Sequence, residues 1–456
     1  MAETLRSVGL DVGTTSTQMI LSELTVQNRA SGFAVPEMEI VERKILYKSP
    51  IHFTPLKGEQ LVDGEGIRQL VQREYHQAGI RPEAVDTGAI IITGETSRKE
   101  NAREVLSALS EFAGDFVVAT AGPDLESVLA AKGAGAVEYS RQSGKTVLHM
   151  DIGGGTSNLA LIRDGKIEKT GCLNVGGRLI RLDGEGRLSY VSPVLGEIWN
   201  HEQGQQPGDA ELRQLAALLN EALEMAAGLR APSDLLEALT TADTAPLPLA
   251  APEPGMVISF SGGVADCIAH SRCWQEFGDL GPMLGAAIRR GRLCQNAYVL
   301  GTETIRATVI GAGCHSAQLS GSTVFYQNVN LPVKNLPVIT LEEEQQEKLS
   351  QVLPDLLSRQ EGSCVLALPG LASPGYREVA ALAREIAAAT RGRDVFLCLR
   401  QDMAKALGQA LAGMLGRSAR ILCIDRVKVG EESYLDIGAP VGPALPVVVK
   451  TLVMGK

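Results

Sequence analysis

Two segments that lie far apart in the sequence share one unusual pattern: an apolar strand that ends at an aspartate, a turn of glycine, threonine or serine, and a second apolar strand. The first segment is VGLDVGTTSTQMIL, residues 8–21, and the second is LHMDIGGGTSNLALI, residues 148–162. Glycines in such a turn let backbone N–H groups approach an anion closely, and the hydroxyl groups add donors. Each hairpin therefore predicts a phosphate-binding loop, and the repeat predicts two half-domains that close on one nucleotide.

The aspartate in each hairpin calls for a cation. Asp11 and Asp151 end the first strands of their hairpins. Because a carboxylate and a phosphate repel each other, a Mg²⁺ ion between them, held mostly through its waters, resolves the conflict. We therefore expect Asp11 and Asp151 to bind the metal and to be essential for catalysis. The residues expected to hold the phosphates are Gly13, Thr14, Thr15, Ser16, Gly153, Gly154, Gly155 and Thr156.

A third glycine-rich turn follows a later apolar strand, in MVISFSGGVADCIA, residues 256–269. The pair Gly262-Gly263 leaves room for a flat ring over the backbone, so these two glycines are the predicted nucleoside contacts. Each of the three turns taken alone is also compatible with an ordinary tight turn. Three such turns in this order, two of them with an aspartate, favour nucleotide binding.

The composition excludes several classes of protein. A chain of 456 residues exceeds the size at which one core keeps growing, so two or three domains are expected. The formal charge of −10 argues against nucleic-acid binding. Neither a signal peptide nor a membrane helix, which needs roughly 18 apolar residues in a row, is expected. The eight cysteines lack metal-ligand spacing and predict reduced, mostly buried thiols.

The order of the predicted elements indicates an α/β protein in three parts. We expect lobe I in residues 1–140, lobe II in 141–297, and a linker with a C-terminal α/β module in 298–456. Further expectations are a strand at 89–92, a helix from Ser97, a strand in DFVVAT, a helix begun by Pro123, a turn at Asp164-Gly165 into a strand at 166–173, helical structure at 210–239, a linker at 330–339, and a small parallel sheet in the module.

The glycine-rich segments resemble the motifs of the actin, Hsp70 and hexokinase ATPase superfamily. DVGTTST resembles the first phosphate motif, DIGGGTSN the second, and ISFSGGVA the adenosine motif. Residues 121–136 resemble the first connecting helix and 282–291 the second, and NVGGRL from Asn174 resembles the segment that follows the second phosphate motif in Hsp70. The resemblance implies two RNase H-like lobes, each a mixed five-stranded sheet with helices, and ATP with Mg²⁺ in the cleft.

Over nearly its whole length the chain resembles the EutA family, the reactivating factors of ethanolamine ammonia-lyase. The specific segments are TGETSRKENA, MDIGGGTSN, FSGGVADCI and the C-terminal YLDIGAPVGPALPVVVKTLV. The resemblance implies an ATP-dependent, chaperone-like factor that opens the adenosylcobalamin-dependent lyase, so that damaged cobalamin leaves and intact adenosylcobalamin binds. Cobalamin would then be an indirect partner, through the lyase. The resemblance also implies the bacterial cytoplasm and the ethanolamine-utilisation microcompartment.

Two positions bear on turnover. Asn158 stands where Hsp70-type second motifs carry another acidic residue, and an amide can orient a water but brings no charge to a metal, so slow hydrolysis is expected. Glu95 is the candidate for positioning the attacking water, with capping of the next helix as an equal alternative.

His149 shares a strand face with Asp151, although such a histidine is more often a core residue.

Other functions remain open from the sequence. A small-molecule kinase of the same superfamily would need a catalytic base early in lobe II, where the polar turn offers only Asn174 and the pair Gly176-Gly177. A nucleotide-switched scaffold without turnover is the third possibility, which Asn158 favours. The C-terminal module, from about Leu341, is expected to face the lyase or a second copy of the chain, as in a homodimer, because it lacks a glycine-rich phosphate turn.

Overall fold

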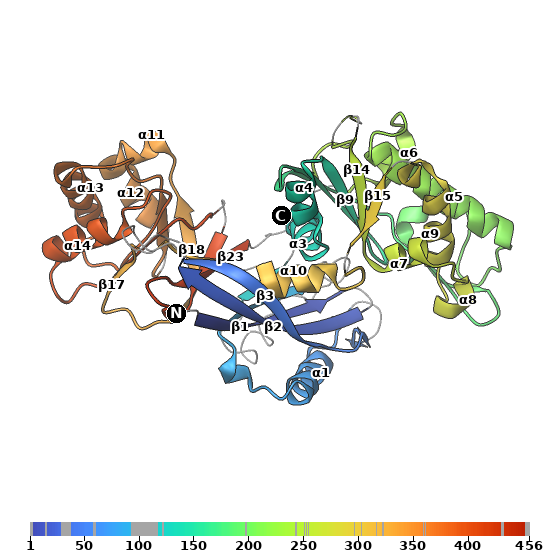
Figure 1. Cartoon of the computed structure of the whole chain (residues 1–456), viewed down its shortest axis with the longest axis horizontal. Coiled ribbons are helices and arrows are strands. Elements are labelled where there is room, and N and C mark those ends of the chain that lie inside the picture. The colour runs from blue at the N-terminus through green and yellow to red at the C-terminus, as the bar shows by residue number, and fades with distance from the viewer. Residues whose placement is uncertain are drawn as a thin grey trace.

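The structure is a computed structural model. The protein has two lobes and a C-terminal module, which are arranged in a row with lobe I in the middle (Figure 1). The structure describes residues 3–13, 16–28, 38–57, 61–92, 117–120, 123–196, 198–241, 244–249, 251, 253, 255–295, 297–301, 303–315, 317–321, 323–358, 360, 362–429 and 433–451.

Lobe I is built on a sheet of order β3-β2-β1-β7-β8, in which β1, β2 and β3 are antiparallel and β7 and β8 run parallel to β1. The short strand β4 pairs with β2, and α1 covers one face of the sheet. The bounds are β1 Glu3–Val12, β2 Ser16–Asn28, β3 Met38–Lys48, β4 His52–Phe53, β5 Leu56–Lys57, β6 Leu61–Val62, α1 Gly64–Gln77, η1 Pro82–Ala84, β7 Thr87–Ile92 and β8 Val117–Thr120.

Lobe II repeats this plan. Its sheet has the order β11-β10-β9-β14-β15, again with three antiparallel strands followed by two strands parallel to the first of the hairpin. The bounds are α3 Pro123–Gly133, α4 Ala136–Ser143, β9 Val147–Ile152, β10 Ser157–Arg163, β11 Lys166–Leu173, β12 Ile180–Leu182, β13 Leu188–Val191, η3 Pro193–Leu195, α5 Asp209–Ala226, α6 Asp234–Leu239, β14 Val257–Ser261, α7 Gly263–Ala269, α8 Trp274–Phe277, α9 Gly281–Arg290, η4 Arg292–Cys294 and β15 Tyr298–Leu300. The predicted two-lobed α/β fold is therefore confirmed.

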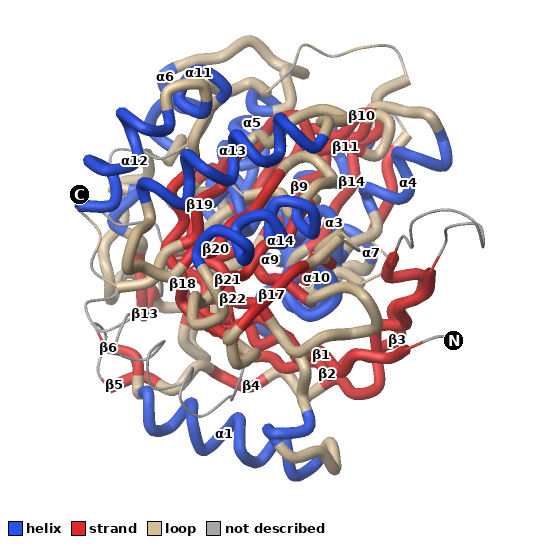
Figure 2. The backbone as a smooth tube through the Cα atoms, turned by 90° about the vertical axis from the view of Figure 1, so that its left-hand side faces the viewer, coloured by secondary structure: helices blue, strands red, loops and turns tan. Residues whose placement is uncertain are grey.

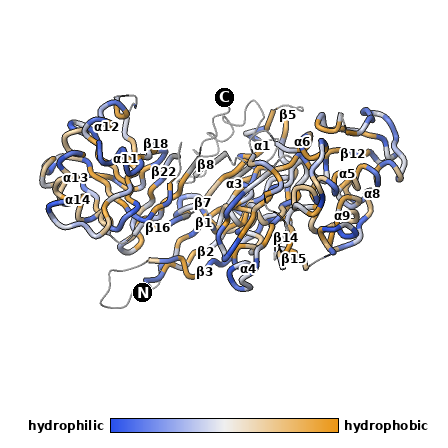
Figure 3. Tube along the Cα trace, turned by 90° about the horizontal axis from the view of Figure 1, so that it is seen from above, coloured by the Kyte–Doolittle hydropathy of each residue, from blue (hydrophilic) through white to orange (hydrophobic). Residues whose placement is uncertain are grey.

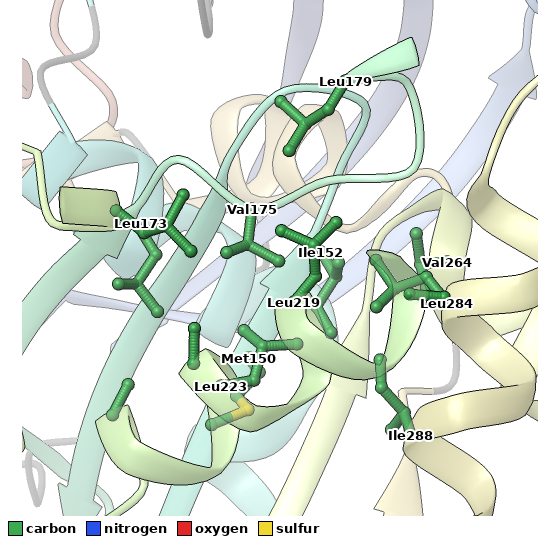
Figure 4. Close-up of a cluster of buried hydrophobic side chains, with 14 of the residues drawn as sticks. Met150, Ile152, Leu173, Val175, Leu179, Leu219, Leu223, Val264, Leu284 and Ile288 are labelled. Carbon is green, nitrogen blue, oxygen red and sulfur yellow. The ribbon is translucent and has the colours of Figure 1, made fainter. Parts of the chain in front are cut away.

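Local sequence explains how β11 follows the second hairpin. Asp164 and Gly165 both adopt positive φ angles, 49° and 70°, which is the conformation that a two-residue hairpin turn requires. The outer face of this sheet is apolar: Met150 and Ile152 of β9 pack with Leu219 and Leu223 of α5 in the largest buried cluster of the chain (Figure 4). Burial of these side chains fixes the strand register, because a slip by one residue would turn them to the opposite face.

The inner faces of the two sheets meet across a pair of helices, α3 and α10 (Ala307–His315). Helix α3 packs on β9, β10 and β11 of lobe II, whereas α10 packs on α3 and on β1, β2 and β7 of lobe I. The prediction that residues 282–291 form the second connecting helix is wrong: they form α9, which packs on α5 and α7 inside lobe II. Both segments are short and rich in glycine and alanine, so their composition does not distinguish them.

Glycines let these central elements touch backbone to backbone. A Cβ atom on Gly133 would lie 1.8 Å from the Ala307 carbonyl oxygen, and one on Gly311 would lie 2.1 Å from that of Leu129. On the lobe I side, a Cβ on Gly9 of β1 would lie 2.7 Å from the nitrogen of Gly313. Since real Cβ atoms do not approach so closely, only glycine is compatible with this crossing.

The C-terminal module is one sheet of eight strands, in the order β16-β23-β22-β18-β19-β20-β21-β17. Strands β18 to β21 are parallel, as predicted, but antiparallel strands extend the sheet on both sides. The predicted linker at 330–339 is wrong, since most of it is β18. The bounds are β16 Ala317–Leu319, β17 Phe325–Gln327, β18 Val333–Thr340, α11 Glu343–Gln346, α12 Leu349–Ser358, β19 Val365–Leu368, α13 Tyr376–Ala389, β20 Val395–Leu399, α14 Ala404–Leu415, β21 Ile421–Asp425, β22 Ser433–Ile437 and β23 Pro446–Thr451.

The module has apolar side chains on both faces of its sheet. Helices α12, α13 and α14 pack on one face, and α13 and α14 lie in front of the strands when the molecule is seen from the module end (Figure 2). Hydrophobic stretches follow the strands inside the module and both lobes (Figure 3). In the part of the chain that the structure describes, no helix combines the length and hydrophobicity needed to cross a membrane. All eight cysteines are free thiols and six of them are buried, as predicted.

The crossing of α3 and α10 yields a first prediction. We expect Gly311→Ala to lower the free energy of unfolding by about 1–3 kcal/mol, because the added Cβ forces two packed backbones apart. Gly413→Ala in α14 is the matched control: no atom lies within 4 Å of its added Cβ, so the substitution should raise stability by about 0.5–1 kcal/mol. Urea unfolding measures both, and equal stabilities of the two variants would contradict the packing argument.

Candidate functional site

The first hairpin ends in a turn that is fixed by backbone and side-chain bonds. Asp11 of β1 lies directly opposite Gln18 of β2, and the Gly13 N–H donates to the Ser16 carbonyl oxygen at 2.9 Å. The Thr54 hydroxyl donates to the Gly13 carbonyl at 2.8 Å. These bonds turn the backbone of Gly13 and Ser16 toward the cleft, at the end of the strand that carries Asp11.

The second hairpin has the same geometry and a further support. The Gly153 N–H donates to the Thr156 carbonyl at 2.9 Å, as Gly13 does to Ser16. The segment after β11 lies against this turn, because the N–H groups of Gly177 and Arg178 donate to the carbonyls of Gly153 and Gly154 at 3.0 and 2.7 Å. A Cβ on Gly176 would lie 2.3 Å from the Gly154 carbonyl oxygen, so a glycine is required there.

One cavity of about 380 Å³ lies between the lobes and collects the predicted residues. Lobe I contributes Asp11, Gly13 and Ser16 to its wall. Lobe II contributes Asp151 with residues 153–156, and the turn Gly262-Gly263. Residues from segments about 250 positions apart in the sequence thus face one space of a size that suits a small ligand.

Asp151 is held by a chain of hydrogen bonds on the inner face of the lobe II sheet. The Ser261 hydroxyl donates to Asp151 Oδ1, and the Thr308 hydroxyl of α10 donates to Oδ2 at 3.3 Å. His149 Nε2 lies 3.0 Å from Ser261 Oγ, and its Nδ1 lies 3.0 Å from Ser259 Oγ. Because Asp151 accepts the Ser261 proton, His149 must donate from Nε2 and accept from Ser259 at Nδ1.

Burial sets the charge states in this chain of bonds. Removal from water lowers the pKa of His149 to about 3, so the imidazole is neutral. Burial raises the pKa of the Asp151 carboxyl, and the hydrogen bonds from Ser261 and Thr308 oppose that shift. A divalent cation would favour the ionised form of this carboxyl. His149 therefore belongs to the support of the site, a role that the sequence did not establish.

The two glycines of the third turn have different roles. Gly262 has a φ of 87°, and a Cβ on it would lie 2.3 Å from the Ile152 carbonyl oxygen, so Gly262 serves the close packing of β14 on β9. A Cβ on Gly263 would meet no atom within 4 Å. Gly263 is exposed to the cavity at the start of α7, and its missing side chain leaves free space there.

The charges around the cavity fit a metal–phosphate ligand. Its wall has five carboxylates but only one arginine among the described residues: Asp11, Glu126, Asp151, Asp266 and Asp279, with Arg178, whose Nε is 2.9 Å from Asp279. An anionic phosphate chain alone would be repelled. Among the described residues no three His, Cys, Asp or Glu side chains form a ready-made metal site. A phosphate chain bound here would therefore need a cation that takes most of its ligands from phosphate and water.

Part of the predicted site lies outside the described residues. This part consists of Thr14, Thr15, Glu95 and the helix expected from Ser97. Conversely, sequence reasoning missed Glu126, Arg178, Ser261 and Thr308 as residues of the site. Arg178 and Ser261 are direct neighbours of predicted glycine turns, which was a usable signal. Glu126 and Thr308 start the two central helices, and only the packing of these helices brings them to the cavity.

The chain is similar to several known proteins. The family model described as "Ethanolamine utilisation protein EutA" matches residues 3–455. The chain is 39% identical over 476 residues to the ethanolamine ammonia-lyase reactivase EutA of Salmonella typhimurium and 40% identical over 470 residues to that of Escherichia coli, each covering 98% of both proteins. Among solved structures, the chain is similar to the Ppx/GppA enzyme of Aquifex aeolicus, with 13% sequence identity and a TM-score of 0.42. The alignment includes 68% of this chain and 99% of the Aquifex chain.

The two aspartates are open to direct test. Asp11→Ala and Asp151→Ala should each lower Mg²⁺-dependent ATP turnover by at least about 100-fold, because each removes one of the two carboxylates expected to hold the metal and removes no apolar packing. The Asn variants should be nearly as impaired, since a neutral amide does not offset the cation. Phosphate release measures turnover and thermal unfolding checks the fold. Wild-type release by both variants at saturating Mg²⁺ would rule out these metal ligands.

The glycine pair provides an internal comparison. We expect Gly263→Val to weaken ATP binding at least about tenfold while leaving stability unchanged, because its side chain enters free space that a nucleoside needs. Gly262→Ala should instead destabilise the fold through the contact with Ile152. Calorimetry with ATP and with inorganic pyrophosphate measures the first effect. Equal losses for both ligands would mean that Gly263 does not contact the nucleoside.

Proposed function

The chain belongs to the EutA family of ethanolamine utilisation proteins, and from this premise we propose that it is an ATP-dependent reactivating factor for ethanolamine ammonia-lyase. The observation that carries the nucleotide part is the cavity into which two equivalent phosphate hairpins open from opposite lobes. The lyase part rests on the names of the two relatives at about 40% identity.

ATP would lie with its phosphates between the hairpins and its nucleoside near Gly263. The backbone N–H groups of the two turns and the hydroxyl of Thr156 would bind the phosphates. Asp11 and Asp151 would hold Mg²⁺, which supplies positive charge against the phosphate oxygens during transfer to water. Glu95 stays the sequence-based candidate for orienting that water, and Glu126, which lines the cavity at the start of α3, is a second carboxylate that can do so.

Nucleotide state would control the angle between the lobes. A triphosphate that is bound by both hairpins favours a closed cleft. Hydrolysis releases the terminal phosphate and so removes contacts that hold the two hairpins together. The lobes turn about α3 and α10, the elements shared between them. We propose that this motion opens the lyase, so that damaged cobalamin leaves the lyase and intact adenosylcobalamin replaces it. Cobalamin then need not bind this chain.

The C-terminal module is proposed to contact the lyase or a second copy of the chain. The strand β23 is paired on both edges, with β22 and β16, so it needs no partner to complete its sheet. Any partner would therefore bind to helices or loops of the module and would not extend the sheet. We also propose a location in the bacterial cytoplasm, within or associated with the ethanolamine-utilisation microcompartment; the names of the relatives support this proposal.

The kinase alternative has less support. Its catalytic base was expected near Asn174 and the pair Gly176-Gly177, but these glycines pack directly on the second hairpin and on Gly281. The Asn174 N–H donates to the Leu239 carbonyl at 2.7 Å. This segment therefore supports the phosphate turn. A scaffold without turnover is separated from the proposed function by measuring phosphate release.

The test is reactivation of cyanocobalamin-inactivated ethanolamine ammonia-lyase. With the full chain, ATP, Mg²⁺ and free adenosylcobalamin, we expect lyase activity to return, together with release of cyanocobalamin and phosphate. Omission of ATP, or use of Asp151→Ala, should leave the lyase inactive. Return of activity without phosphate release would support a switched scaffold. Phosphorylation of an added sugar or carboxylate without any reactivation would support the kinase.

A further inference from the structure

Each phosphate hairpin has an amide directly opposite its aspartate. Gln18 pairs with Asp11 across β1 and β2, and Asn158 pairs with Asp151 across β9 and β10. In both hairpins the amide follows the aspartate by seven residues. Directly opposed residues of antiparallel strands point to the same face of the sheet, so each amide lies beside its carboxylate on the inner face, toward α3 and α10.

Both amides are buried with an unused acceptor. Gln18 is 4% exposed and Asn158 is 2% exposed. Gln18 Oε1 and Asn158 Oδ1 accept no hydrogen bond from any described residue, whereas Gln18 Nε2 lies 3.4 Å from the Ile305 carbonyl. Buried acceptors without partners are rare in native proteins. Two of them at equivalent positions beside two metal-binding candidates point to a donor that belongs to a ligand of the site.

The chemistry of the cavity limits what that donor is. A phosphate chain that is fully ionised has no proton to donate, and a bare cation has no N–H or O–H group. The waters of a hydrated divalent cation do carry donors, and Mg²⁺ in particular keeps several of its waters. Each amide oxygen is placed to accept from such a water beside the neighbouring carboxylate.

Amides suit this place better than further acids. Asp11 and Asp151 together balance the charge of one divalent cation. Carboxylates at positions 18 and 158 would add two negative charges at or beside a cavity wall that already has five carboxylates and one arginine among the described residues. Gln18 lines this cavity and Asn158 lies beside Asp151 next to it, so the added charge at either position would act against the phosphates. An amide accepts the same hydrogen bond without the charge.

We propose that Gln18 and Asn158 are positioning residues of the metal site, whose amide oxygens accept hydrogen bonds from the waters of the divalent cation held between Asp11 and Asp151. This inference rests on the proposed nucleotide function. It assigns a role to Gln18, which is not among the site residues expected from the sequence, and it gives Asn158 a role that does not depend on its replacing an acid.

The test titrates Mn²⁺ into the full chain saturated with a non-hydrolysable ATP analogue, with free Mn²⁺ followed by its paramagnetic resonance signal. Gln18→Met and Asn158→Leu keep the side-chain size but remove the acceptor, and each should raise the Mn²⁺ dissociation constant about tenfold. Analogue binding in EDTA should be unchanged. Asn158→Asp and Gln18→Glu, which keep an acceptor, should bind Mn²⁺ at least as tightly as the wild type.

A matched control uses Asn220, a buried amide of α5 that is 6% exposed and whose Oδ1 also lacks a described partner. Asn220→Leu should leave Mn²⁺ affinity unchanged. The inference is overturned if Gln18→Met and Asn158→Leu bind Mn²⁺ like the wild type, or if the acidic variants lose affinity as the apolar ones do. If Gln18→Met or Asn158→Leu does not fold, the Mn²⁺ dissociation constant of Gln18→Glu or Asn158→Asp at the same position tests the inference instead. Absence of analogue-dependent Mn²⁺ binding by the wild type would instead overturn the nucleotide function.

Discussion

The close contact of α10 with α3 and with β1 is the constraint on which the rest of the structure depends. Four glycines remove the side chains that would keep these backbones apart: Gly133 and Gly311 between the helices, and Gly9 and Gly313 between α10 and the lobe I sheet. This contact brings the inner faces of both sheets toward one pair of helices. It also places the first turns of α3 and α10 beside the ends of the strands that carry Asp11 and Asp151, so Glu126 and Thr308 become part of the cavity.

The two lobes use the same sheet plan but support their aspartates differently. In lobe II the strand beside Asp151 supplies Ser261, and the row behind it holds His149 and Ser259. In lobe I the equivalent positions are Ile91 beside Asp11 and Gly9 behind it. Helix α10 packs so closely against Gly9 that no side chain fits at this position. In lobe II the inner face of the sheet therefore supports the Asp151 carboxylate with hydrogen bonds, whereas in lobe I the same part of the sheet packs on helix α10.

Sequence reasoning reached the parts of this molecule that depend on local chemistry. The hairpins, the turn at Asp164-Gly165 and the strand-turn-helix at 256–269 follow from residue types at fixed spacing. It failed where packing decides. Residues 307–315 form a helix whose role depends on what it touches, and β18 contains Pro337, which reads as a loop although neighbouring strands hold it in a sheet. The amides at 18 and 158 were visible as a repeated spacing, but their meaning required the register and the burial.

Among the described residues, the module packs against lobe I. Val441 and Val448 of the module are buried against Leu5 and Leu24 of lobe I, and the module lies at the opposite end of the molecule from lobe II (Figure 1). Lobe I and the module therefore form one packed unit, and the helix pair α3 and α10 lies between this unit and lobe II. If the nucleotide changes the angle between the lobes, as proposed, the far end of the module would be displaced more than the residues of the cleft, because it lies farther from the helix pair. Under the proposed function, the module would then be the part of the chain that moves farthest against a bound partner.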